Sequence, residues 1–264
     1  MTFPTSDLSP YQLRILESYP PNKVFALVSW GCAGTSWLAH ILNSHPDIYC
    51  VHAANFTWSQ FANAKTANDI NYLRILGMQG YAAKLSGDVH GVSRESIPQL
   101  QSELGQHFRA GIIVREPFAR IRSQISLMNR FSDLSKVWDI SYIKKFEKSL
   151  GRDPTQLPLE DQYKIHAMNM LNAIIEEYKL AKIFRIEDIS SSPDQLDNLI
   201  KHISSGTVSS SRKWLESALN TQRINSHVKR HHAVLNADDM KLLNTIVSSE
   251  AWEIYRTLGY DTNA

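Results

Sequence analysis

The chain has 264 residues, of which 43% are hydrophobic and 20% are charged, as is usual for a globular protein with a sizeable core. Its net charge of +2 gives no case for binding nucleic acid or a membrane surface, and no apolar run is long enough to span a membrane. The two cysteines, Cys32 and Cys50, argue against a disulfide framework and lack the neighbours of a zinc site. We therefore expect a cytoplasmic, metal-free protein.

Hydrophobic periodicity predicts the elements in chain order. Residues 9–19 read as a short helix closed by Pro20-Pro21, so that residues 1–23 form an N-terminal helical extension. Short apolar runs between turn residues predict strands at 24–30, 48–52, 81–89, 111–114 and 181–186. Apolar residues at helical spacing predict helices at 36–44, 96–108, 118–128, 140–146, 159–180, 192–203 and 237–258.

Three predictions concern individual segments. In the helix at 159–180, Met168, Leu171 and Ile175 are expected to point inward. Residues 56–78 are expected to be helical or irregular, and the serine- and glycine-rich segment 204–211 is expected to be a mobile loop.

Strands that alternate with helices predict an α/β fold, with a parallel sheet flanked by helices. With no internal repeat, we expect a single domain over residues 1–264.

A small-residue loop lies between the first predicted strand and its helix. Its residues are Gly31, Cys32, Ala33 and Gly34. Thr35 and Ser36 follow and suit the helix N-terminus as caps. Backbone N–H groups of such a loop and the dipole of the following helix attract an anion. The loop therefore predicts a P-loop-like phosphate or sulfate site, although an ordinary strand-to-helix connection explains it about equally well.

Two further strand ends carry residues suited to a ligand, because parallel strands bring their carboxyl ends to one edge of the sheet. His90 follows one strand, and Arg115 follows another, with Ser123 on the next helix. Arg115 and Ser123 suit a second phosphate, whereas an isolated arginine more often caps a helix or pairs with a neighbour such as Glu116. Two anion sites on one sheet predict a nucleotide with phosphates at both ends.

These motifs together resemble those of the cytosolic sulfotransferases and their bacterial relatives, which transfer a sulfonate from 3′-phosphoadenosine 5′-phosphosulfate (PAPS). The family's first loop, roughly YPKSGTTWL, aligns with residues 30–38, WGCAGTSWL. Its second motif, a strand followed by Arg, an acidic or Asn residue, Pro and a helix with Ser, is similar to residues 111–123, GIIVREPFARIRS. Residues 184–196 and 253–260 are weaker matches. The resemblance implies transfer of a sulfonate to a hydroxyl or amine of a small-molecule acceptor.

The resemblance also implies roles for single residues. The loop, Thr35 and Ser36 hold the phosphosulfate, and Trp37 stacks on the adenine. Arg115 and Ser123 hold the 3′-phosphate, over which Lys229 and Arg230 close unless they form a solvated turn. His90 lies where the family has its catalytic base, and His52 is the reserve, since imidazole titrates near neutral pH. Aromatic residues that line an acceptor pocket or belong to the core are Phe56, Trp58, Phe61 and Trp138.

Two residues depart from the family pattern. Cys32 stands where the family has a lysine or arginine, and Asp88 stands where it has a second lysine. Substitute cations are Lys84, Arg94, Arg120 and Arg122. The alternatives are a pseudoenzyme that binds PAPS or its product PAP without turnover, and a P-loop kinase or NTPase, which the absence of a Gly-Lys-Ser/Thr ending weakens. A homodimer is left open.

Overall fold

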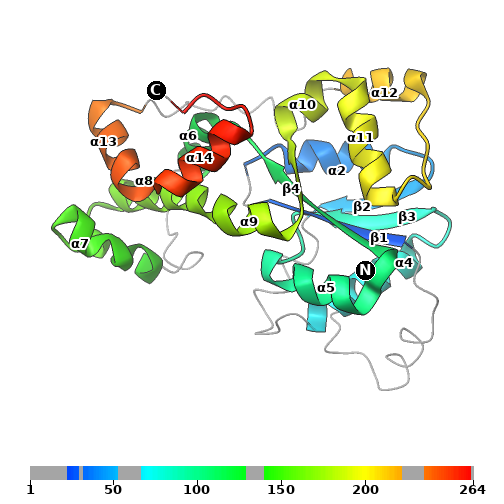
Figure 1. Cartoon of the computed structure of the whole chain (residues 1–264), viewed down its shortest axis with the longest axis horizontal. Helices are drawn as coiled ribbons and strands as arrows, with labels where there is room; N and C mark the ends of the chain where they lie inside the picture. The colour runs from blue at the N-terminus through cyan, green and yellow to red at the C-terminus, as the bar shows by residue number, and fades with distance from the viewer. Residues whose placement is uncertain (1–22, 30–31, 53–66, 129–139, 222–234, 263–264) are drawn as a thin grey trace. The chain divides into compact units, whose positions relative to one another are not determined.

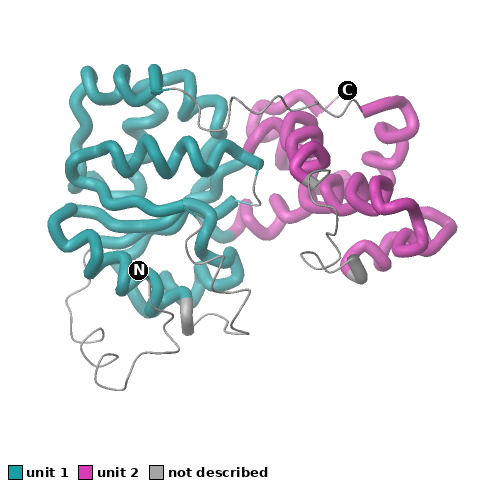
Figure 2. The backbone as a smooth tube through the Cα atoms, turned by 180° about the vertical axis from the view of Figure 1, so that it is seen from behind, with its two compact units in different colours: residues 1–114, 180–226 teal, residues 115–179, 227–264 magenta. Residues whose placement is uncertain are grey.

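The computed structural model describes residues 23–29, 32–52, 67–128, 140–221 and 235–262. The chain divides into two compact units, residues 1–114 with 180–226 and residues 115–179 with 227–264 (Figure 2). The single domain over residues 1–264 stays a prediction. Residues 1–22, which make up nearly all of the predicted helical extension, lie outside the described residues.

The first unit contains a five-stranded sheet in the order β2-β3-β1-β4-β5, in which every pair of neighbours is parallel (Figure 1). The strands are β1 (Lys23–Val28), β2 (Ile48–His52), β3 (Leu85–Val89), β4 (Phe108–Val114) and β5 (Lys182–Arg185). Central β1 reads as a continuous apolar run because both of its faces are covered. The predicted α/β fold with a parallel, helix-flanked sheet is confirmed.

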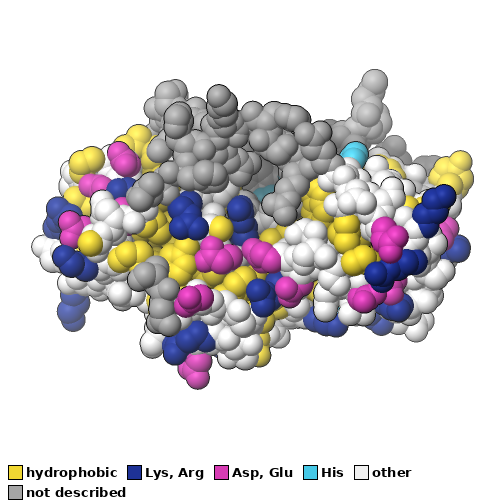
Figure 3. Space-filling model, turned by 90° about the horizontal axis from the view of Figure 1, so that it is seen from above, with side chains coloured by type: hydrophobic (Ala, Val, Ile, Leu, Met, Phe, Trp, Pro, Cys, Tyr) yellow, Lys and Arg dark blue, Asp and Glu magenta, His cyan; other side chains and the backbone are white. Residues whose placement is uncertain are grey.

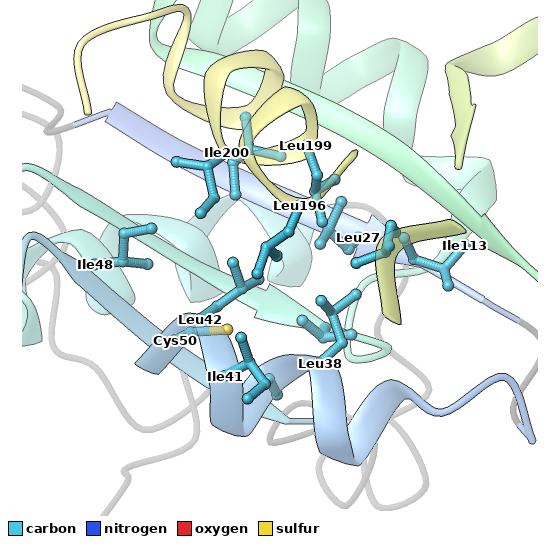
Figure 4. Packing of buried hydrophobic residues seen from close by; sticks show 14 of the residues in the cluster. Leu27, Leu38, Ile41, Leu42, Ile48, Cys50, Ile113, Leu196, Leu199 and Ile200 are labelled. Atoms are coloured by element: carbon cyan, nitrogen blue, oxygen red, sulfur yellow. The ribbon is translucent and has the colours of Figure 1, made fainter. Parts of the chain in front are cut away.

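Helices cover both faces of this sheet (Figure 1). One face carries α2 (Thr35–Asn43) and α11 (Pro193–Ser204), with α10 (Ile186–Ser191) and α12 (Arg212–Leu219) packed on α11. The other face carries α4 (Ala67–Gln79) and α5 (Ile97–Leu104). Figure 4 shows Leu196 and Leu199 of α11 and Leu38 of α2 meeting Leu27 of β1 in the main hydrophobic cluster. The apolar stripe of each helix therefore fixes it to the sheet.

The second unit is helical. Its elements are α6 (Pro117–Met128), η5 (Ile140–Phe146), α7 (Glu147–Leu150), η6 (Pro154–Gln156), α8 (Leu159–Asn169), η7 (Met170–Ala173), α9 (Ile174–Leu180), α13 (Ala237–Ile246) and α14 (Ser249–Thr257). Asn172 joins distant parts of this unit, because its side chain donates to the Ile246 carbonyl at 2.9 Å and accepts from the Ser248 N–H at 2.8 Å. This side chain fixes the turn between α13 and α14 against η7.

Three predicted helices are shorter or interrupted. The helix expected at 159–180 is divided into α8, η7 and α9; Met168 and Leu171 are buried as predicted, but Ile174 is buried in place of Ile175. The helix expected at 237–258 is two helices, because the Ser248 hydroxyl accepts from the Ala251 N–H and starts α14. The helix expected at 96–108 is α5, followed by η3 (Gly105–His107), and β4 begins at Phe108, earlier than predicted.

Other segments differ in detail. The strand expected at 81–89 begins at Leu85, because residues 81–84 form a turn in which Tyr81 is 74% exposed. The segment 56–78 is helical over its described part, within α4. In the segment 204–211, Val208 is buried and the Ser210 hydroxyl lies 3.2 Å from His45 Nε2. The mobility of that segment stays a prediction.

Charges are mixed on the surface. Among the coloured side chains of Figure 3, Lys and Arg lie interspersed with Asp and Glu. None of the helices in the described part of the chain has the length and apolar character needed to cross a bilayer.

Candidate functional site

The strand order reverses beside β1. The connection through α2 leads from β1 to the edge strand β2, whereas β3 is followed by β4 on the other side of β1. In an open parallel sheet, the crevice outside the carboxyl ends of the strands at such a reversal is where ligands bind. The loop after β1, the end of β2 and the end of β3 meet at this edge, since Val89 pairs with both Leu27 and His52.

The loop between β1 and α2 bends through left-handed backbone. Cys32 has φ 53° and Gly34 has φ 74°, a region that a side chain disfavours. A Cβ on Gly34 would lie 3.2 Å from Ile186 Cγ1, so glycine suits this position for space as well as for conformation. Gly34 is also the N-cap of α2. Thr35 is the first residue of the helix, and the prediction that Thr35 and Ser36 cap α2 is wrong.

The hydroxyls of Thr35 and Ser36 instead contact His52. His52 Nε2 lies 3.0 Å from Thr35 Oγ1 and 3.3 Å from Ser36 Oγ. These contacts exist because β2 ends at His52 beside the first turn of α2. Burial lowers the pKa of His52 from its ordinary value, and His90 lowers it further when it is protonated. The lowered pKa favours the neutral imidazole of His52, whose Nε2 lies beside two hydroxyls at the helix N-terminus.

His90 is held by two backbone carbonyls, one at its backbone N–H and one at its ring. Its N–H donates to the Leu27 carbonyl at 2.8 Å, and its φ of 76° turns the chain out of β3. Nδ1 is hydrogen bonded to the Ser29 carbonyl, and a carbonyl accepts only, so Nδ1 carries the proton. The lone pair of the neutral ring is then on Nε2, as a general base requires. The rings of His52 and His90 are stacked with their centroids 6.1 Å apart.

Asp88 fixes the turn that carries His90. Its side chain is fully buried at 0% exposure and accepts hydrogen bonds from the Tyr72 hydroxyl of α4 and from the Gly91 N–H. A Cβ on Gly91 would lie 2.5 Å from Asp88 Oδ1, so the turn requires a glycine there. Where the family has a lysine, this chain has a buried anchor for the histidine loop. Sequence reasoning assigned no role to Tyr72 because only the α4–β3 packing brings it to Asp88.

The other predicted residues of the first loop have different surroundings. Cys32 is half-buried and is not in a disulfide, and Ala33 is fully buried. Trp37 is 6% exposed and belongs to the main hydrophobic cluster. This placement favours packing of the Trp37 ring over stacking on an adenine. Gly31 lies outside the described residues.

Two of the four substitute cations, Lys84 and Arg94, lie in the first unit and are ion-paired. Lys84 pairs with Asp47 at 3.0 Å and precedes β3, at the opposite end of that strand from His90, so this prediction is wrong. Arg94 pairs with Glu95 at 2.7 Å. In the second unit, Arg120 is buried near Tyr255, which is itself buried.

The residues of the second motif belong to the second unit. Arg115 directly follows β4 and is half-buried, and Ser123 is buried on α6. Glu116 caps α6 through the Phe118 and Ala119 N–H groups, the first at 2.9 Å, and its carboxylate lies 3.8 Å from Arg122, the fourth candidate cation.

Some predicted residues cannot be placed. Lys229 and Arg230, and the aromatic residues Phe56, Trp58, Phe61 and Trp138, lie outside the described residues. Within the described ranges, no three His, Cys, Asp or Glu side chains are grouped so as to hold a metal ion.

No family model matches the chain, and no curated protein matches it. Among solved structures, the chain is similar to the crystal structure of a sulfotransferase from Alicyclobacillus acidocaldarius, with 14% sequence identity and a TM-score of 0.46. The match covers 92% of this chain and 97% of that chain.

Proposed function

We propose that this protein is a sulfotransferase that moves a sulfonate from PAPS to a hydroxyl or amine of a small-molecule acceptor. The observation that carries the proposal is the convergence of three features at one edge of the sheet. These are the left-handed loop before α2, the hydroxyls of Thr35 and Ser36, and the imidazole of His90 with its lone pair on Nε2. An anion-binding helix start beside a general base is what in-line transfer of a sulfonate requires.

The end of β1 fits a ligand for a further reason. The Ser29 side chain is buried, and its Oγ has no hydrogen-bond partner among the described residues. A buried hydroxyl without a partner costs about 1–3 kcal/mol. A phosphosulfate oxygen at this edge would supply the missing partner, in the same place as Thr35, Ser36 and His90.

In the proposed reaction, His90 Nε2 accepts the proton of the acceptor hydroxyl or amine while the acceptor atom forms its bond to sulfur. The bond between sulfur and the bridging oxygen breaks, and PAP leaves with the electron pair. Thr35 and Ser36 donate hydrogen bonds to the phosphosulfate, and positioning with stabilisation of the developing charge supplies the catalysis. On the motif alone, Arg115 and Ser123 are proposed as ligands of the 3′-phosphate.

A pseudoenzyme that binds PAP or PAPS without turnover is the second candidate. The specific observation in its favour is the absence of both family lysines, replaced by the thiol of Cys32 and by the buried carboxylate of Asp88. A neutral thiol does not stabilise the charge of a leaving phosphate as an ammonium group does.

The deciding experiment supplies PAPS together with a panel of hydroxyl and amine acceptors and detects sulfonated product by mass spectrometry. In parallel, PAP binding is measured by calorimetry, and ATP with magnesium replaces PAPS in a third arm. Product formation supports the sulfotransferase. PAP binding without product from any acceptor supports the pseudoenzyme, and binding or turnover of ATP–magnesium without PAP binding supports a P-loop kinase or NTPase.

A further inference from the structure

In the described part of the chain, no lysine or arginine forms a hydrogen bond or ion pair with Thr35, Ser36 or His52, where the phosphosulfate is proposed to bind. Cys32 offers a thiol, and the basic residues of the first unit that were candidates, Lys84 and Arg94, are paired with Asp47 and Glu95. An oxygen anion in a partly desolvated site without a positive partner is costly. The group on the same edge of the sheet that can become positive, and that already touches the anion-binding hydroxyls, is the imidazole of His52.

Resting on the proposed function, we propose that His52 is the cation that holds the phosphosulfate end of PAPS, acting through the hydroxyls of Thr35 and Ser36. Each hydroxyl has a single proton to donate. In a neutral His52 whose proton is on Nδ1, Nε2 accepts the proton of one hydroxyl, and that hydroxyl has none for a ligand. In imidazolium both ring nitrogens carry a proton, so Nε2 donates to a hydroxyl oxygen, the hydroxyl proton is available to an oxygen of the ligand, and the ring adds a positive charge.

The electrostatics of the site make this change depend on the ligand. In this structure, burial lowers the pKa of His52, and His90 lowers it further when it is protonated. An anion bound at the helix start has the opposite effect, because a negative charge nearby favours imidazolium. PAPS or PAP binding therefore draws one proton from solvent onto His52.

The other groups around His52 are not suited to be this cation. Thr35 and Ser36 on α2 are uncharged, and the Asp88 carboxylate on β3 is engaged by Tyr72 and Gly91. His90, which directly follows β3, has its Nδ1 proton committed to the Ser29 carbonyl. Two stacked imidazoles thus take two roles, His90 as base and His52 as cation, because one is fixed by a carbonyl and the other by hydroxyls.

The test measures the affinity for PAP by calorimetry between pH 6 and 8.5, in buffers of different ionisation enthalpy. We expect the wild type to take up about one proton and to lose up to about tenfold in affinity per pH unit. His52→Gln should bind PAP weakly and show a smaller slope, and His90→Gln should keep the wild-type slope. His40→Gln, exposed on α2, is the matched control. The second phosphate ionisation of PAP, near pH 6, is common to all variants and cancels in the comparison.

A double variant and a measurement on the unaltered chain complete the test. Cys32→Lys added to His52→Gln should restore affinity without restoring the slope, because a lysine stays charged over this range. NMR titration of the His52 ring should show its pKa rising when PAP binds to the wild type. Equal slopes for the wild type and His52→Gln, or an unmoved His52 pKa with PAP bound, would overturn the role of His52 and leave the proposed function standing. A wild type that does not bind PAP at any pH would overturn both.

Discussion

The His90 ring donates a hydrogen bond from Nδ1 to the backbone carbonyl of Ser29, a residue 61 positions earlier that directly follows β1. A side chain at the end of β3 is thereby fixed by the backbone at the end of the central strand. This bond selects the tautomer of His90 and holds its ring at the end of β1. The chemistry proposed for the site depends on this relationship.

His90→Ala should lower turnover by about two to four orders of magnitude, the usual effect of removing a general base. The affinity for PAP should change little, because His90 contacts the acceptor rather than the nucleotide in the proposed reaction. Steady-state rates and calorimetry check the two parts. His40→Ala should leave both unchanged. Loss of turnover with His52→Ala but not with His90→Ala would transfer the base to His52.

Tyr72→Phe should destabilise the first unit by about 1–3 kcal/mol, because the buried carboxylate of Asp88 loses a hydrogen-bond donor. The free energy of unfolding in urea measures this effect. Tyr178→Phe, at a half-exposed tyrosine, is the matched control and should be close to neutral. Equal stabilities of the two variants would show that Tyr72 does not hold Asp88 in place.

Arg115→Ala should abolish most of the thermal stabilisation that PAP gives to the wild type, since it removes the proposed partner of a doubly charged phosphate. Arg152→Ala, at an exposed arginine, should keep that stabilisation. Differential scanning fluorimetry with and without PAP checks both variants. An unchanged shift in Arg115→Ala would remove this arginine from the 3′-phosphate site.

Acid should destabilise the protein partly through His166. Burial lowers the pKa of His166 from 6.5 to about 4, so the folded chain binds fewer protons there than the unfolded chain as the pH falls below 6.5. The stabilising effect of the neutral imidazole is complete above pH 6.5 and declines toward pH 4. Between pH 7 and pH 5, His166 should account for about 2 kcal/mol of lost stability.

Urea unfolding of the wild type and His166→Leu at both pH values measures this contribution. The variant is expected to lose about 2 kcal/mol less than the wild type over the interval. His40→Leu, at an exposed histidine, should follow the wild type. Parallel losses for wild type and His166→Leu would contradict the lowered pKa.

Much of the fold could be predicted from local pattern. Apolar runs such as 24–30 and 111–114 predicted strands, and the cap and proline of Ser192-Pro193-Asp194 predicted a helix that covers the sheet. These signals are local, because a strand or helix that must bury one face repeats its apolar residues at the period of that structure. Breaks inside long periodic stretches, as at Ser248, were missed because they depend on a single cap.

The sequence and the tertiary structure each determine part of the site. The sequence alone indicated an anion-binding loop and two histidines at strand ends, because small residues before a helix and polar residues after buried strands are visible along the chain. The tertiary structure decided that Thr35 contacts His52, that His90 donates to Ser29 and that Tyr72 donates to Asp88. These contacts join residues 16 to 61 positions apart. They follow from strand order and register, which arise from packing of the whole sheet and from no local pattern.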